Sequence, residues 1–419
     1  MSDNSLPPMR LLKCDAARRE PGIMLFNVRP SGKERDTTKV GWVIGIDQAG
    51  EIVFQLKLDA SIQDVRLHPN GNIFFSQPDI GTVNEIDRSG RPLRRWHATG
   101  KWQDKLPPNG SIALDMARAH HTIDVLPNGN LLLLSNEPRE FDDWPGSDTD
   151  PDALRETAVL IGDIVIEMTL DAEIVQQWHM LDILDPYRIC YGSRRVTTVN
   201  RHMPNSNDWA HLNCASYDER DDSILLSLRT QDCIAKIDRT SGILQWILGT
   251  PANWQAPWAE KLLTPKGPVQ WQYHQHDCSI TPSGTILCFD NGNYRATPFD
   301  TPMDEAQCYS RVVEFSVDEN ARTVEQVWSY GDALDDRLFA CFQGGARRLP
   351  ETGNTFITYG GIATKDGRPT ANNDTGFGRA RLIEVSPDGE VLFDLWVDSS
   401  EQENPISYSV FRAEHMPNL

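Results

Sequence analysis

Internal repetition is the feature of this sequence that most restricts its fold. One sequence pattern recurs: a β-rich run, an acidic residue, a tight turn and a second β-rich run that ends in an aromatic residue. The turns Asp-Arg-Ser-Gly and Pro-Asp-Gly supply residues that tolerate the positive φ of a tight hairpin. Each copy therefore predicts a β-hairpin. The six copies are Gly45–Phe54, Glu85–Trp96, Glu167–Trp178, Lys236–Trp246, Glu314–Trp328 and Glu384–Trp396.

A second hairpin alternates with the first. Two hairpins per unit make four strands per unit, and six such units predict an all-β chain folded as a six-bladed β-propeller with four-stranded blades. The sixth copy of the second hairpin is either degenerate near the N-terminus or assembled from both chain ends. A pair of β-sandwiches is the alternative fold. The five evident copies lie at His68–Asn72, Pro127–Asn130, Tyr217–Ser223, Pro282–Thr285 and Pro350–Asn354.

The repeats set the expected domain boundaries. Residues 1–39 are expected to form an N-terminal extension, 40–397 the propeller and 398–419 a C-terminal tail. The spacing between copies is uneven, which predicts long decorating loops. These loops either form a lid over a central site or differ in length without any functional reason. The insertions are expected at about 97–119, 137–160, 180–208, 247–272 and 292–308.

Charge and hydropathy exclude several classes of protein. The chain carries 40 Lys and Arg against 60 Asp and Glu, a formal net charge of -20. Such a surface argues against nucleic-acid binding through phosphates and against anionic membranes. No apolar run approaches the ~18–20 residues of a membrane helix. The first residues show no secretory signal, so a cytoplasmic location is expected, and homo-oligomerisation stays open.

Three histidines occupy one position of the repeat. Counting back eight residues from the turn glycine of the second hairpin reaches Gln63, His121 and His276, and the longer fourth hairpin gives His211. Equivalent positions of a propeller are related by rotation about its axis, so imidazoles at strand ends facing the channel would converge. The alternative is that these histidines satisfy backbone groups in the core or in turns.

Arg229 ends the strand that returns toward His211, so antiparallel pairing places the two residues side by side. Three histidines and an arginine suit a compact oxyanion, because arginine binds sulfate or phosphate bidentately and histidine donates, carries a proton or attacks. Three imidazoles also suit zinc or iron, although a cation beside Arg229 is electrostatically unfavourable. His274 is expected on the same strand face as His276, where it could substitute in either role.

Over residues 40–397, the sequence resembles a known family, the bacterial PAPS-independent arylsulfate sulfotransferases. That family has a six-bladed propeller fold, which agrees with the repeat count. Known members are periplasmic and carry an extra N-terminal β-domain, which is not expected here because blade-like sequence starts near residue 40, and Cys214 stands where serine is more usual. The resemblance is carried by Asp208–Asn213, Asp222–Arg229, Ile237–Gly249, Gln275–Asp277, Phe289–Gly292, Tyr309–Glu314 and Gly344–Asn354.

The resemblance implies transfer of a sulfuryl group from a small aromatic sulfate donor to a phenolic acceptor, without PAPS, metal or other cofactor. It implies a ping-pong cycle in which His276 becomes a sulfohistidine. His211 is then the proton donor or an oxyanion ligand, and Arg229 and His121 bind the sulfuryl oxygens. Further residues expected at the substrate site are Asn213, which holds the neighbouring groups, His274 and His120.

Two other functions remain open from the sequence. One is a metal-dependent lyase, hydrolase or oxygenase that uses His121, His211 and His276 as ligands. The other is a scaffold that binds protein partners, which would not require histidines and an arginine to converge on a buried point.

Overall fold

The computed structural model describes residues 6–34, 38–194, 205–333 and 337–417. The expected all-β class is confirmed: strands dominate these residues, and the α-helix that they contain is the short α1, Met180–Ile183. None of the helices in the described part has the length and apolar character that a membrane crossing requires.

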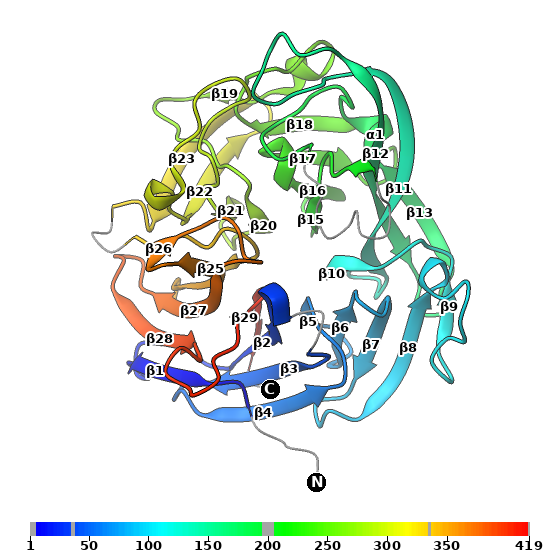
Figure 1. The fold of residues 1–419 in the computed structure, drawn as a ribbon. Helices are drawn as coiled ribbons and strands as arrows, with labels where there is room; N and C mark the ends of the chain where they lie inside the picture. Colours follow the sequence, from blue (N-terminus) through cyan, green and yellow to red (C-terminus); the bar gives the residue numbers. More distant parts are fainter. Residues whose placement is uncertain (1–5, 35–37, 195–204, 334–336, 418–419) are drawn as a thin grey trace.

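The strands form six sheets, and Figure 1 shows these sheets set around a common centre. The chain runs through the sheets in sequence order. The first sheet contains β30 (Ala413–Met416), β2 (Ile23–Pro30), β3 (Gly41–Asp47) and β4 (Ile52–Leu58), with β29 (Tyr408–Ser409) beside β2. The second contains β5 (Val65–Leu67), β6 (Ile73–Gln77), β7 (Thr82–Ile86), β8 (Pro92–Ala98) and β9 (Ile112–Leu114). The third contains β10 (His120–Val125), β11 (Leu131–Trp144), β12 (Glu156–Met168) and β13 (Ile174–His179), with β14 (Ser206–Asn207) beside β12.

The other three sheets repeat this order. The fourth contains β15 (Leu212–Asp218), β16 (Ser223–Leu228), β17 (Cys233–Asp238) and β18 (Leu244–Gly249). The fifth contains β20 (His276–Ile280), β21 (Ile286–Asp290), β22 (Arg311–Asp318) and β23 (Thr323–Tyr330), with β19 (Thr264–Pro265) beside β23. The sixth contains β24 (Gly345–Arg348), β25 (Thr355–Lys365), β27 (Phe377–Val385) and β28 (Val391–Val397), with β26 (Arg368–Pro369) beside β25 and β1 (Met9–Cys14) beyond β28.

The hairpins lie where the sequence repeats predict them. In the second sheet, the first type of hairpin joins β7 to β8, and its turn closes with a 2.9 Å bond from Gly90 N–H to the Asp87 carbonyl. The second type joins β5 to β6, with the matching 2.8 Å bond from Gly71 N–H to the His68 carbonyl. Both glycines have φ of 86°, the left-handed region that the turn requires.

Both ends of the described chain are built into sheets. β30 pairs with β2 in the first sheet, and β1 pairs with β28 in the sixth. The expected boundaries at residues 39/40 and 397/398 therefore do not coincide with the ends of the sheets. The hairpin copy that the sequence does not show is replaced by β30 and β2, from opposite ends of the chain.

The core consists of hydrophobic layers between consecutive sheets. Six of the clusters each draw residues from two neighbouring sheets, and one of them joins the sixth sheet to the first. The aromatic residue that ends a repeat enters these layers: Trp96, Trp178 and Trp246 are at most 3% exposed. Packing between sheets thus continues around the whole ring.

The insertions extend beyond the sheets, and some of their residues, such as Trp144, Leu181 and Trp254, pack into the layer between the third and fourth sheets. The one expected at 137–160 extends the β11–β12 hairpin, whose pairing runs on to Trp144 and Glu156. The others carry α1, β9, β14, β19 and the short 3-10 turns Thr99–Lys101, Trp258–Lys261 and Glu305–Gln307. Residues 195–204 of the insertion expected at 180–208 lie outside the described residues.

The β2–β30 pairing gives a first prediction. Phe26 is 1% exposed in the layer between the sixth and first sheets, and it pairs with Ala413. Phe26→Ala should lower the free energy of unfolding by about 3–5 kcal/mol, because the cavity adds to the lost transfer free energy. Urea unfolding followed by tryptophan fluorescence measures this change.

The control is Val53→Ala on β4 of the same sheet, where the side chain is 51% exposed. This change should stay within about 0.5 kcal/mol. Equal effects of the two variants would contradict the placement of Phe26 in a packed layer.

Candidate functional site

Three histidines meet at the centre of the ring. His121 lies on β10, His211 immediately precedes β15 and His276 opens β20; Figure 1 shows these three strands next to the centre. One ring nitrogen of each lies within 4.8 Å of the others. Ring centroids are 5.0 Å apart for His121 and His211, 6.5 Å for His121 and His276, and 6.4 Å for His211 and His276. The three side chains can therefore act on one small group.

Irregular backbone at the same place in three sheets directs these side chains. The pairing register shifts between His120 and Ile123, between Leu212 and Cys214, and between His276 and Ser279. His121 and His211 have φ of 51° and 46°, and Asp277 has φ of 63°. A bulge re-aims a side chain that regular alternation would point elsewhere, and bulges are common beside active sites.

Asn291 fixes the tautomer of His276. The Asn291 amide nitrogen donates to the carbonyls of Ala340 and Gln343 at 2.7 and 2.8 Å, so its oxygen faces His276. That oxygen lies 2.8 Å from His276 Nδ1, which must therefore carry the proton. Nε2 keeps its lone pair and accepts a hydrogen bond from the Gln343 N–H at 3.3 Å. Burial and the Arg229 charge hold the pKa of His276 well below its usual range, so the ring stays neutral.

Asp208 orients His211. Its Oδ2 lies 2.6 Å from His211 Nδ1, so Nδ1–H donates to the carboxylate and Nε2 faces the other histidines. A carboxylate in this place also stabilises the charged imidazolium. His211 is therefore arranged to give and take a proton through Nε2.

His120 lies behind His121 and sets its tautomer. His120 Nε2 is 3.2 Å from the carbonyl oxygen of Ser135, which can only accept, so Nε2 carries the proton. Burial, with the charge of Arg118, lowers the pKa of His120 to about 3, and its Nδ1 is an acceptor. His121 Nδ1, 2.8 Å away, must then donate, which leaves His121 Nε2 with its lone pair. His120 thus acts through His121.

Arg229 lies beside the histidines. It follows β16, its backbone N–H donates to the His211 carbonyl at 3.3 Å, and its Nη2 donates to the Cys341 carbonyl at 3.4 Å. After burial, its charge is the largest influence on the pKa of His276. The guanidinium therefore supplies positive charge at the place where the three rings meet.

Two other expected site residues have different surroundings. Asn213 is fully buried, donates to the Gln275 carbonyl at 2.8 Å and accepts from Asp277 N–H at 3.3 Å, so it holds the backbone on both sides of His276. His274 lies 3.1 Å from an oxygen of Asp232 and packs on Tyr294. With φ of 53° it precedes β20, so strand alternation does not relate it to His276.

Three residues that shape the site were not among the site residues expected from the sequence. Asp208 and Asn291 stand inside the motifs that carried the family resemblance, three residues before His211 and two after Phe289. Gln63 occupies the repeat position that holds histidine in other sheets, and its Oε1 accepts from the His121 N–H at 2.8 Å. The repeat position was thus a usable signal for Gln63.

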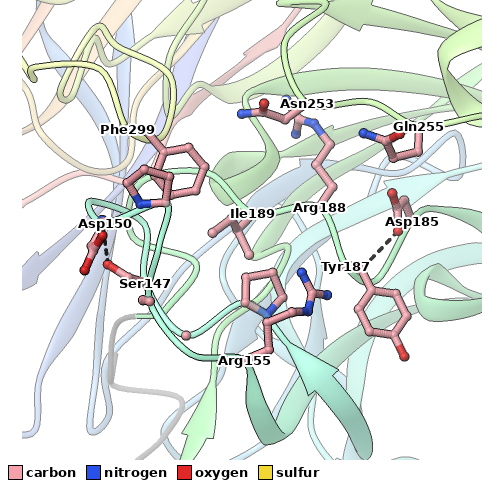
Figure 2. A pocket seen from close by; sticks show the side chains of 14 residues that line it. Ser147, Asp150, Arg155, Asp185, Tyr187, Arg188, Ile189, Asn253, Gln255 and Phe299 are labelled. Carbon is pink, nitrogen blue, oxygen red and sulfur yellow. Dashed lines mark hydrogen bonds between the residues drawn. The ribbon is translucent and has the colours of Figure 1, made fainter.

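A pocket with a volume of about 510 Å³ lies among the insertion loops, separate from the histidines. Figure 2 shows Arg155, Arg188, Tyr187, Ile189 and Phe299 around it. The described residues that line it include none of the expected site residues. The insertions do meet there and nearby: Phe299 N–H donates to the Asp148 carbonyl at 3.1 Å.

Comparison with known proteins identifies the family. The family model for arylsulfotransferase (ASST) matches residues 10–409. The chain belongs to the arylsulfotransferase family.

Two curated relatives in this family are arylsulfate sulfotransferases named AssT. The protein of Escherichia coli is 28% identical over 342 residues, which cover 72% of this chain and 49% of that protein. The protein of Lelliottia amnigena is 31% identical over 212 residues, which cover 41% of this chain and 35% of that protein. The chain thus spans about half or less of the length of these relatives.

Two solved structures show a distant likeness to this chain. A protein of unknown function from Bacteroides caccae has a TM-score of 0.49 at 14% identity, covering 93% of this chain and 99% of that one. A virginiamycin B lyase from Staphylococcus aureus has a TM-score of 0.34 at 12% identity, covering 76% of this chain and 88% of that one.

The Asp208–His211 pair gives a second prediction. Asp208→Asn should lower turnover of the protein's substrate about 10²–10⁴-fold, because an amide can donate to Nδ1 and favour the wrong tautomer. Steady-state rates measured across pH test this effect.

The matched control is Asp182→Asn, which removes an exposed carboxylate that pairs with Arg139 on the surface. Its rate should stay within about twofold of the parent protein, since surface ion pairs contribute little. A fully active Asp208→Asn variant would exclude proton transfer through His211.

Proposed function

We propose that this chain transfers a sulfuryl group from an aryl sulfate to a phenol through a sulfohistidine on His276. The observation that carries this proposal is the state of His276: a neutral ring with its lone pair on Nε2, held by Asn291 and beside Arg229. Family membership and the curated relatives' names support the substrate class. No cofactor is needed for either half of the reaction.

In the first half-reaction, the lone pair of His276 Nε2 attacks sulfur. The bond between sulfur and the aryl oxygen breaks, and its electron pair stays on that oxygen. The departing phenolate takes a proton from the His211 imidazolium. Arg229 binds the sulfuryl oxygens and offsets the charge that gathers on them and on the leaving oxygen.

In the second half-reaction, an acceptor phenol enters the same place. Its hydroxyl proton passes to neutral His211 as its oxygen attacks sulfur, and the sulfur–nitrogen bond breaks with its electron pair returning to His276 Nε2. One residue serves as acid and then as base, as a ping-pong cycle with chemically similar donors and acceptors requires. His121 faces the transferring group, and burial and the neighbouring His211 hold its pKa well below its usual range, so its ring is neutral.

The fold proposal follows from the same ring of sheets. Six sheets, each with at least four strands, and six hydrophobic layers that include one between the last and first sheets support a six-bladed β-propeller. In that architecture the site lies at one end of the central channel, where strand ends from several blades meet. A β-sandwich pair would not bring β10, β15 and β20 to one point.

The test of function is incubation with a chromogenic aryl sulfate, with and without a phenol acceptor. Release of the donor phenol that depends on the acceptor would support transfer, whereas release without it would indicate a sulfatase. Mass spectrometry of protein trapped without acceptor should find one added SO₃ group on the peptide that contains Gln275 and His276. His276→Ala should abolish both signals.

Two further variants separate the roles. Arg229→Ala should leave the adduct detectable but slow its formation about 10²–10³-fold, or about 3–4 kcal/mol in barrier, since an oxyanion ligand only lowers the barrier. His274→Ala is the control for His276, and its adduct should persist. An adduct on His121 or His211 would overturn the assignment of the nucleophile.

A second candidate function rests on the same nitrogen atoms. Each of the three histidines has its Nδ1 bonded to a neighbour, and one ring nitrogen of each lies within 4.8 Å of the others, which is how metal-binding histidines are commonly held. A metal-dependent lyase, hydrolase or oxygenase is therefore the alternative, opposed by the nearby Arg229 charge. Metal analysis of protein purified without an affinity tag distinguishes them: a stoichiometric metal whose removal ends activity would favour the alternative.

A further inference from the structure

Arg412 lies directly behind the histidines, and its charge has no part in the proposed steps. It precedes β30, and its side chain is 1% exposed. Nη1 donates to Asp277 Oδ1 and Nη2 to Thr122 Oγ1, each at 2.6 Å. Nε lies 3.1 Å from Asp64 Oδ1, an ion pair without a hydrogen bond. A buried charge with this many partners is a specific arrangement, because an unpaired one would be costly.

The partners of Arg412 belong to one layer of the ring. Asp64, Thr122 and Asp277 each follow, by one residue, the positions of Gln63, His121 and His276 on three different sheets. The fourth sheet joins through the Asn213 carbonyl, which accepts from Arg412 Nη2 at 3.3 Å. Arg412 takes the corresponding place in the first sheet, because it follows Phe411, whose ring centroid is 5.7 Å from that of His121.

The sixth sheet leaves room for this arginine. A Cβ at Gly345 would lie 2.6 Å from Asp277 Oδ2 and 3.2 Å from Arg412 Cβ, so a larger residue there would displace both side chains. The guanidinium is also neutralised locally. Asp64 and Asp277 flank it, Arg66 and Arg347 pair with the same two carboxylates, and both also pair with Glu414, so three arginines face three carboxylates. Its hydrogen-bonding capacity is therefore directed at protein groups rather than at a substrate anion.

We propose that Arg412 is a positioning residue for the sulfuryl-transfer site, whose planar fork ties four other sheets to its own, one layer behind Gln63, His121 and His276. This inference rests on the proposed function of the histidines. Because each partner adjoins a site residue, a shift of the guanidinium moves the nucleophile relative to the residues that bind the transferring group. Misplacement of about 1 Å can cost about 10²-fold in rate.

The test compares the same substitution at two arginines that share Asp277. Arg412→Lys keeps the positive charge but cannot reach Asp64, Asp277 and Thr122 together, since an ammonium lacks the planar fork. Its rate of adduct formation on His276 should fall about 10²-fold, with the KM for aryl sulfate changed less than threefold. Arg347→Lys is the control, because Arg347 contacts Asp277 but neither Thr122 nor Asn213 in the described structure. Its rate should stay within about threefold.

A second readout does not depend on activity. Histidine-selective ¹⁵N NMR should show the His276 Nδ1 resonance, assigned with His276→Gln, moved in Arg412→Lys and unmoved in Arg347→Lys. If the parent protein forms no adduct with aryl sulfates, the proposed function fails while this comparison still decides the positioning role. Equal rates and unmoved resonances in both variants would overturn that role.

A milder variant covers the case in which Arg412→Lys does not fold. Thr122→Val is nearly isosteric and removes one of the bonds to Arg412 as well as the 2.8 Å bond from Thr122 Oγ1 to the Asn213 carbonyl. It should slow adduct formation about tenfold without raising the KM. A parent-like rate in this folded variant would equally overturn the proposal.

Discussion

A sheet that is apolar on both faces must be covered on both faces, and this constraint governs the whole molecule. One sheet of this chain cannot cover another on both sides, so the layers continue from sheet to sheet until the sixth meets the first. Each sheet then turns a strand end toward the centre. A site made of His121, His211 and His276 is a direct product of that arrangement, because no two of these residues share a sheet.

The chemistry at the centre depends on hydrogen bonds made away from it. Each ring has one nitrogen committed to a neighbour: His120 for His121, Asp208 for His211 and Asn291 for His276. The inward nitrogen is thereby defined, with a lone pair on His276 and a carboxylate-supported ring at His211. In the proposed cycle, neutral His276 then makes the nucleophilic attack, the His211 imidazolium gives the proton and Arg229 binds the anion.

Local sequence was sufficient to predict the hairpins, because a turn is determined by residues close together in the chain, such as Asp87 and Gly90, which hydrogen-bond to each other. The convergence of the histidines was predictable too, since equivalent positions of a repeat are related by rotation. Contacts between distant segments left no such signal. The sequence around Arg412 gives no indication that it pairs with Asp64 and Asp277. The role of β30 was also not predictable, because it depends on pairing with β2, a strand almost 400 residues earlier. The left-handed backbone at His274 likewise breaks the alternation on which its placement relied.

The pairing of β2 with β30 also has a consequence for how the ring is made. During synthesis, β2 leaves the ribosome early and must wait, with an unpaired edge, until β30 follows it. The intervening sheets can pack on one another in the meantime, but the first sheet and the two layers beside it are completed last. Arg412 arrives with the same late segment. The arrangement of the three histidines is therefore tied to completion of the ring, so a partly made chain would have the imidazoles without their final spacing.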